Sequence, residues 1–122
     1  MKTHKDLIVW QKSIDFVTEL YKETSNFPKE EQYGLVSQMR RAAVSIPSNI
    51  AEGAARNSDK ELARFLFIAR ASASELETQL LISENLGYLV EVSPNKLKEN
   101  LLELSKMLTT LIHKINQRIN RE

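Results

Sequence analysis

Residues 33–56, YGLVSQMRRAAVSIPSNIAEGAAR, combine the period of a helix with a proline, a glycine and a strip of polar side chains. Apolar residues recur here at steps of three and four, which places them on one side of a helix. This apolar ridge consists of Val36, Met39, Ala43, Ile46 and Ile50. The stretch therefore predicts an amphipathic helix that packs against a core through the ridge.

A second side of this helix is polar, and a proline lies inside it. The polar residues are Arg41, Ser45, Ser48, Asn49, Glu52 and Arg56. Pro47 lacks the N–H that would bond the carbonyl of Ala43, and its ring crowds that carbonyl. We therefore expect the helix to be kinked or broken near Pro47, with Asn49 bonding backbone groups that the kink frees. A shaped, polar helix of this kind suggests recognition.

Three more helices are predicted around it. The first should run from residues 3–6 to about residue 25, with a core stripe of Leu7, Trp10, Ile14, Val17 and Tyr21. The third should run over residues 58–86, because Ser58 and Glu61 form a capping box and Gly87 follows. Its expected core positions are Leu62, Phe65, Leu66, Ala69, Ala73, Leu76 and Leu80.

The fourth helix should open with Ser93 as its cap and Pro94 at its first position. Leucine and isoleucine then alternate at steps of four and three, at Leu97, Leu101, Leu104, Leu108, Leu111 and Ile115. Four amphipathic helices joined by short turns predict an all-α, antiparallel up-and-down four-helix bundle that forms one domain over residues 1–122. A second apolar set either widens the core or forms a subunit interface. Its members are Ile8, Phe67, Ile82, Leu102, Ile112 and Ile119.

The composition is that of an ordinary globular protein, with 42% hydrophobic and 27% charged residues among 122 and no cysteine. The absence of cysteine removes disulfides and thiolate chemistry. The formal net charge is only +1, but the charges are uneven. Six bases face three acids between residues 40 and 70, and residues 106–121 hold four bases and no acid. Local basic surface is therefore expected.

No apolar run reaches the roughly 18 residues of a membrane span. The N-terminus has a basic start, but Gln11 and Lys12 interrupt its apolar part, which is unlike a signal peptide. We therefore expect a cytoplasmic protein without a membrane partner.

Three blocks of the sequence resemble a known family. They are DLIVWQKSIDFV at residues 6–17, FPKEEQYGLVSQMRRAAVSIPSNIAEGAARNSDKE at residues 27–61 and ASELETQLLISENLGYL at residues 73–89. The blocks are similar to those of the small bacterial four-helix-bundle proteins encoded by intervening sequences in 23S ribosomal RNA genes. The resemblance covers nearly the whole chain up to residue 89, whereas the fourth helix matches in general pattern only.

This resemblance carries expectations of its own. It implies a homo-oligomer, with ring-shaped pentamers in the family. Relatives associated with diversity-generating retroelements resemble basic barrels that bind nucleic acid and a reverse transcriptase. The resemblance thus brings forward RNA, including the fragmented ribosomal RNA, as a hypothetical ligand.

The residues do not support an enzyme. Neither His4 nor His113 follows a glutamate by three positions, so the Glu-x-x-His pairs of a di-iron bundle are missing. No arginine precedes either histidine at the four-to-six-residue spacing of helical-bundle ribonucleases. Glu75 and Glu77 point in different directions on a helix and cannot act on one bond. We therefore predict no catalytic residue, metal ion or cofactor.

Arginines of the second and third helices are the candidate binding residues. Arg40 and Arg41 diverge by roughly 100° on a helix, so one can pair with an acid while the other meets solvent or phosphate. The acids expected to form structural ion pairs, within or between subunits, are Glu52, Glu75 and Glu77. The residues expected to contact nucleic acid are Arg40, Arg41, Arg56 and Arg64.

A few cations per subunit bind nucleic acid weakly, but a symmetric ring would multiply them. Only Tyr33 and Tyr88 look available for stacking on bases, so backbone-directed binding is favoured over sequence-specific reading. The sequence therefore predicts an oligomeric interaction module with RNA or DNA as its ligand. The alternative is a structural or protein-binding homo-oligomer whose arginines are all engaged by carboxylates.

Overall fold

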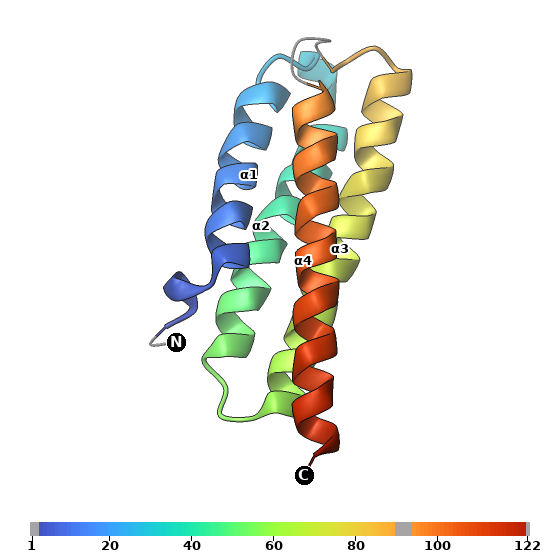
Figure 1. Ribbon diagram of the computed structural model, residues 1–122. Helices are drawn as coiled ribbons and strands as arrows, with labels where there is room; N and C mark the ends of the chain where they lie inside the picture. Colours follow the sequence, from blue (N-terminus) through green and yellow to red (C-terminus); the bar gives the residue numbers. More distant parts are fainter. Residues whose placement is uncertain (1–2, 90–93, 122) are drawn as a thin grey trace.

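The computed structural model describes residues 3–89 and 94–121, without the side chains of residues 94 and 95, and these residues form four long helices (Figure 1). The long helices are α1 (Ile8–Thr24), α2 (Leu35–Ala54), α3 (Asp59–Asn85) and α4 (Pro94–Asn120). Two single-turn 3-10 helices, η1 (His4–Asp6) and η2 (Lys29–Glu31), precede α1 and α2. The described residues contain no strand, and the predicted all-α fold is confirmed.

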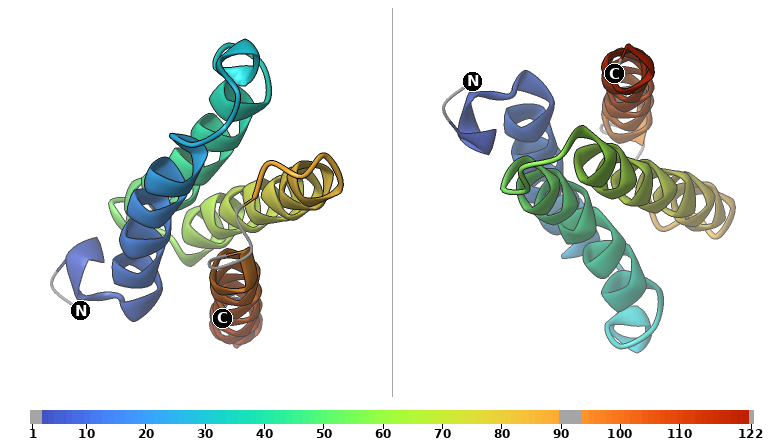
Figure 2. Two further views of the ribbon diagram at one scale, coloured as in Figure 1. Left: turned by 90° about the horizontal axis from the view of Figure 1, so that it is seen from above. Right: turned by 90° about the horizontal axis from the view of Figure 1, so that it is seen from below.

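Each long helix packs against two others, in the order α1, α2, α3, α4 and back to α1. Consecutive helices run in opposite directions, so the bundle is antiparallel and up-and-down, as predicted (Figure 1). Seen along the bundle, α1 and α2 tilt one way, α3 tilts the other, and α4 lies nearly end-on (Figure 2). The core lies along the axis that the four helices share.

The buried face of α1 is not the predicted one. Val9, Phe16 and Leu20 are buried, whereas Ile14 and Tyr21 of the predicted stripe are exposed. The rest of that stripe, Leu7, Trp10 and Val17, is half-buried at the edge of the core. Two hydroxyl residues complete the observed face, because each donates to a carbonyl of its own helix: Ser13 to Trp10 at 2.7 Å and Thr24 to Leu20 at 2.8 Å. A polar side chain that is satisfied in this way can be buried at little cost.

The apolar ridge of α2 is buried along its whole length, as predicted. The helix runs without interruption through Pro47, so of the two expected forms the break is wrong, and the kink stays a prediction. Asn49 does bond the backbone, but its side-chain amide donates to the carbonyl of Ser45 at 2.8 Å rather than to that of Ala43. The same amide also donates to the Ser45 hydroxyl at 2.8 Å. The Ser45 hydroxyl also shares a hydrogen bond with the Ser72 hydroxyl at 2.8 Å, so the polar side of α2 is bonded both to its own helix and to α3.

A close approach joins α2 to α3 at Gly53. A Cβ atom built on Gly53 would lie 2.8 Å from the Cβ of Phe65, which is closer than non-bonded carbon atoms approach each other in proteins. The helices can therefore pack at this distance only because residue 53 has no side chain. At the other end of α3, Gly87 adopts a φ of 75°, as expected of a glycine that follows a helix.

One of the two hydrogen bonds of the predicted capping box forms at the start of α3. The Ser58 hydroxyl accepts from the Glu61 N–H at 3.2 Å, but the Glu61 carboxylate binds Arg64 instead of the N–H of Ser58.

In α4 the predicted apolar seam is buried except for the half-buried Leu111, and Pro94 is the first residue of the helix. Ser93, its predicted cap, lies outside the described residues.

The second apolar set divides in two. Ile112 is buried and Ile119 packs against the core, so these two widen it. The other four are exposed, namely Ile8, Phe67, Ile82 and Leu102.

Candidate functional site

Arg40 is held by the end of α1. Its Nη2 atom donates to the carbonyl of Tyr21 at 3.1 Å, and its Nε atom donates to the Thr24 hydroxyl at 3.0 Å. The guanidinium also lies over the Tyr21 ring, 4.4 Å from its centroid. A cation near a helix C-terminus also interacts favourably with the negative end of the helix dipole. Arg40 therefore joins α2 to α1, and its partner is a helix end rather than any of the three predicted glutamates.

Arg41 diverges from Arg40, as adjacent positions on a helix predict. Its side chain is exposed. No hydrogen bond or ion pair joins it to any residue that the structure describes. Of the two neighbouring arginines, Arg41 is therefore the more exposed to solvent.

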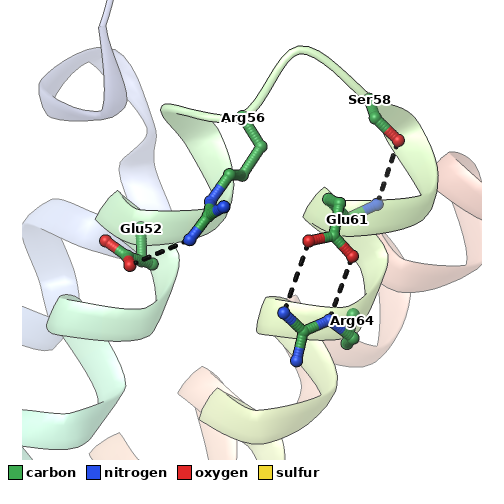
Figure 3. Close-up of polar contacts among 5 residues, drawn as sticks. All are labelled: Glu52, Arg56, Ser58, Glu61 and Arg64. Atoms are coloured by element: carbon green, nitrogen blue, oxygen red, sulfur yellow. Dashed lines mark hydrogen bonds and ion pairs between the residues drawn. The ribbon is translucent and has the colours of Figure 1, made fainter.

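Arg56 and Arg64 flank the turn between α2 and α3 (Figure 3). Arg56 pairs with Glu52 at 3.2 Å, and Arg64 pairs with Glu61 at 3.0 Å. Both guanidinium groups lie near the face of the buried Phe65 ring, at 5.1 Å and 4.5 Å from its centroid. The ring and the two carboxylates thus hold two cations side by side at this turn.

These ion pairs leave both arginines accessible. The Arg56 side chain is 45% exposed and that of Arg64 is 57% exposed. The hydrogen bond from Arg64 lowers the pKa of the Glu61 carboxyl and raises the pKa of Arg64, so both stay charged at neutral pH. Exposed pairs of this kind contribute little to stability and exchange readily with other ions.

Two further cations gather at this end of the bundle. Arg118, near the end of α4, donates to Asp59 at the start of α3, with the shorter contact at 2.7 Å. This hydrogen bond lowers the pKa of the Asp59 carboxyl. Lys60 is exposed, and within the described part of the chain no carboxylate pairs with it. The α2–α3 turn and the C-terminus lie at the same end (Figure 1), so we call Arg56, Lys60, Arg64 and Arg118 the basic end.

Sequence reasoning did not place Lys60 and Arg118 at a site. The signal for Arg118 was the run of four bases in residues 106–121. The helices α3 and α4 are antiparallel and both 27 residues long, so the end of α4 lies beside the start of α3.

The three glutamates predicted to form ion pairs have different surroundings. Glu52 pairs with Arg56. Glu75 accepts from the side-chain amide of Gln79 at 3.1 Å, and no ion pair joins it or Glu77 to the residues described within this chain. Pairing of Glu75 or Glu77 with another subunit stays a prediction.

One of the two predicted stacking aromatics is occupied. The Tyr88 hydroxyl donates to Glu31 at 3.0 Å, which raises the pKa of Tyr88, and its ring contacts Phe27. Tyr33 is 91% exposed, but it lies next to α2's first turn, at the end opposite the basic end. Neither of the two tyrosines predicted to stack on bases is therefore an available platform at the basic end.

The outward face of α3 is unusually apolar. Its centre line from Phe67 to Leu81 carries no charge, at a helical period of 100° per residue. The residues on it are Phe67, Ala71, Ser74, Thr78 and Leu81, all exposed, and we call them the α3 stripe. Ile68 and Ile82 extend it on one side. The helices α2 and α4 pack against α3, and within the described residues the Arg70 guanidinium, 4.5 Å from the centroid of the Phe67 ring, covers one end of this exposed stripe.

Neither histidine is part of a cluster. His4 is half-buried with its ring against the edge of Trp10, and His113 is exposed. Among the described residues, no group of three or more histidines, cysteines or carboxylates could hold a metal ion. Of the helices in the described part of the chain, none has both the length and the apolar character needed to cross a bilayer.

The family model described as 23S rRNA-intervening sequence protein matches residues 5–110. The chain belongs to this family. A crystal structure of a protein with unknown function from the S23 ribosomal protein family of Bacteroides thetaiotaomicron is similar to it, with a TM-score of 0.79. The two are 22% identical, and the match covers 87% of this chain and 96% of that one. No curated protein matches the sequence.

The similarity to the Bacteroides structure supports the fold of this 23S rRNA-intervening sequence family member. At 22% identity this similarity concerns the fold alone and not a ligand. The resemblance drawn from the three sequence blocks is confirmed, and the family match extends through most of α4.

Proposed function

We propose that this protein is a cytoplasmic interaction module that assembles into a homo-oligomer and binds the backbone of RNA or DNA through basic surface gathered by the assembly. The observation that carries the proposal is the α3 stripe. A contiguous uncharged strip about 20 Å long, judged from 1.5 Å per residue, is typical of a surface that a partner covers.

A second copy of the chain is the partner that we favour for the stripe. Ala71, Ser74 and Thr78 are small, so a helix of another subunit can approach α3 closely there. Phe67 and Leu81 lie at the two ends and would anchor such a contact. Arg70 and Glu77 lie on one side of the stripe, and Glu75 lies on the other. A second subunit could complete the ion pairs predicted for the two glutamates.

The nucleic-acid part of the proposal rests on Arg41 and the basic end. Arg41, Arg56 and Arg64 are exposed, and the bonds of Arg56 and Arg64 are of the weak, exchangeable kind. We leave Arg40 out of the interface, because its guanidinium is occupied by α1. Three or four cations per subunit bind phosphates weakly, and assembly multiplies them.

Light scattering of the purified chain tests the assembly. We expect a mass that is a multiple of 14.0 kDa at micromolar concentration. Ala71→Glu places a charge at the middle of the stripe and should lower the mass toward one chain. Gln117→Glu adds a charge at an exposed position of α4 and serves as the control. A mass of one chain for the unmodified protein would refute self-association.

Electrophoretic mobility shifts with a structured RNA, across a salt series, test the ligand. The combined variant Arg41→Ala, Arg56→Ala and Arg64→Ala should lose most of the binding at low salt. Lys22→Ala, Lys29→Ala and Lys96→Ala together remove the same charge from exposed positions outside the proposed interface and should bind nearly as the unmodified protein does. If the unmodified protein does not bind at low salt, the alternative of a structural or protein-binding homo-oligomer is favoured.

A further inference from the structure

A cleft opens between the α2–α3 turn and the last turns of α4. Its cavity volume is about 510 Å³. The polar residues that line it are Arg56, Asn57, Ser58, Asp59, Lys60 and Arg118. We call this cavity the turn cleft. It brings together residues of three helices that the sequence separates by as many as 66 positions, from Gly53 to Ile119.

Three of the lining side chains are cationic and one is acidic. The acid, Asp59, already accepts two hydrogen bonds from Arg118, at 2.7 and 3.3 Å. Arg56 is engaged by Glu52, which is not among the lining residues. The carboxylates therefore hold both guanidinium groups in position while the ammonium of Lys60 adds a further positive charge. An anion that enters the cleft meets charges that are already arranged.

The neutral residues of the cleft supply donors as well. The Ser58 oxygen accepts from the Glu61 N–H, which leaves its own hydroxyl hydrogen to donate. Asn57 is exposed and carries an amide with two donor hydrogens. A tetrahedral oxyanion accepts several such bonds at once, whereas a planar base would require an exposed ring, and Phe65 beside the cleft is buried.

We infer that the turn cleft receives a phosphate group of a nucleic-acid backbone, with Lys60, Arg56 and Arg118 as its cationic contacts. This inference rests on the proposed function and names the turn cleft as a place where the nucleic-acid backbone binds. It accounts for sequence-independent binding, because every nucleotide presents the same phosphate. It also adds to the interface two residues, Lys60 and Arg118, that the sequence did not single out.

Lys60→Ala in the assembled protein is the sharpest test, because the lysine is exposed and its loss leaves the ion pairs of Arg56 and Arg118 intact. Binding of a structured RNA is measured by fluorescence anisotropy at several salt concentrations. We expect affinity to fall about threefold to tenfold and the slope of log K against log salt to decrease by about one. Lys29→Ala, an exposed lysine at the other end, should change neither quantity.

Asp59→Asn provides a test of opposite sign. It removes the carboxylate of the cleft, so affinity for the same RNA should rise. Circular dichroism checks that each variant is folded. If the unmodified protein binds RNA but Lys60→Ala binds as Lys29→Ala does, the inference is overturned and the proposed function stands. If the unmodified protein binds no RNA at low salt, both are overturned.

Inorganic phosphate distinguishes a nucleic-acid backbone from a free anion. Backbone amide signals of residues 57–60 are followed by NMR during titrations with RNA and with phosphate alone. The inference expects RNA to shift these signals at concentrations far below those that phosphate requires. Signals that respond to phosphate but not to RNA would contradict it.

Discussion

The helices α3 and α4 are equally long, yet their surfaces differ. Among the α4 side chains that the structure describes, the exposed large hydrophobic one is that of Leu102, and the other apolar ones face the core or its edge. In α3 four large apolar residues are exposed, in addition to a fully buried inner face. One core is enough to account for the sequence of α4. The sequence of α3 contains apolar residues for two contacts, and the subunit provides one.

The largest effect should separate the two faces of α3. Leu76 is fully buried and Leu81 is 52% exposed. Leu76→Ala should lower the free energy of unfolding by about 3 kcal/mol, because it removes packed atoms and leaves a cavity. Leu81→Ala should change it by less than about 0.5 kcal/mol in the single chain. Urea unfolding at a concentration where the chain is monomeric measures both, and equal losses would contradict the distinction.

The contact of α3 with α2 should be nearly as sensitive. Gly53→Ala should destabilise the bundle by about 2 kcal/mol, because the new Cβ would overlap the Cβ of Phe65 and push the helices apart. The better helix propensity of alanine, worth about 1 kcal/mol, offsets only part of such a clash. Thermal unfolding would reveal the loss as a lower midpoint. A stabilised Gly53→Ala variant would show that α2 and α3 can separate freely.

A smaller effect is expected where α3 ends. Gly87 has a positive φ but open space around it, so only its backbone conformation resists substitution. Gly87→Ala should cost about 1 kcal/mol, and Gly87→Asn clearly less, because asparagine tolerates the left-handed region better. Denaturant midpoints of the two variants provide the measurement. A larger loss for asparagine than for alanine would refute this explanation.

The smallest effect concerns the bond between the start of α3 and the end of α4. The Arg118 hydrogen bond lowers the pKa of the Asp59 carboxyl in the folded protein. The stabilisation that this hydrogen bond gives the fold is therefore present at pH above the pKa of aspartate in the unfolded chain, about 3.9. It is lost as the pH falls through the lower pKa of Asp59 in the folded protein. Stability of Asp59→Asn should depend less on pH below about 4 than that of the unmodified chain. Urea unfolding at pH 7 and pH 3 tests this, and identical pH profiles would refute it.

Sequence patterns predicted α2 better than α1 for a physical reason. In α2 the apolar residues at steps of three and four form one ridge, with charged and polar residues opposite. In α1 apolar residues occur on several sides, and the buried face includes Ser13 and Thr24. A rule that looks for apolar residues passes over hydroxyls that bond their own helix. It therefore selected the wrong stripe.

The candidate site shows a similar limit. Adjacent positions on a helix indicated that Arg40 and Arg41 diverge, but not which of them another helix would cover. The partner of Arg40 is the last turn of α1, and whether that turn lies beside Arg40 depends on how α1 and α2 pack. The pairing of Asp59 with Arg118 joins residues 59 positions apart and likewise depends on how α3 and α4 lie together.

Local signals in the sequence determined the number of helices, most of their ends and the inward faces of α2, α3 and α4, because periodicity, caps and glycines act within a few residues. The tertiary structure alone decided the inward face of α1, the continuous course of α2 through Pro47 and the gathering of Arg56, Lys60, Arg64 and Arg118 at one end. These features depend on contacts between residues distant in the sequence, and no pattern of neighbours records them.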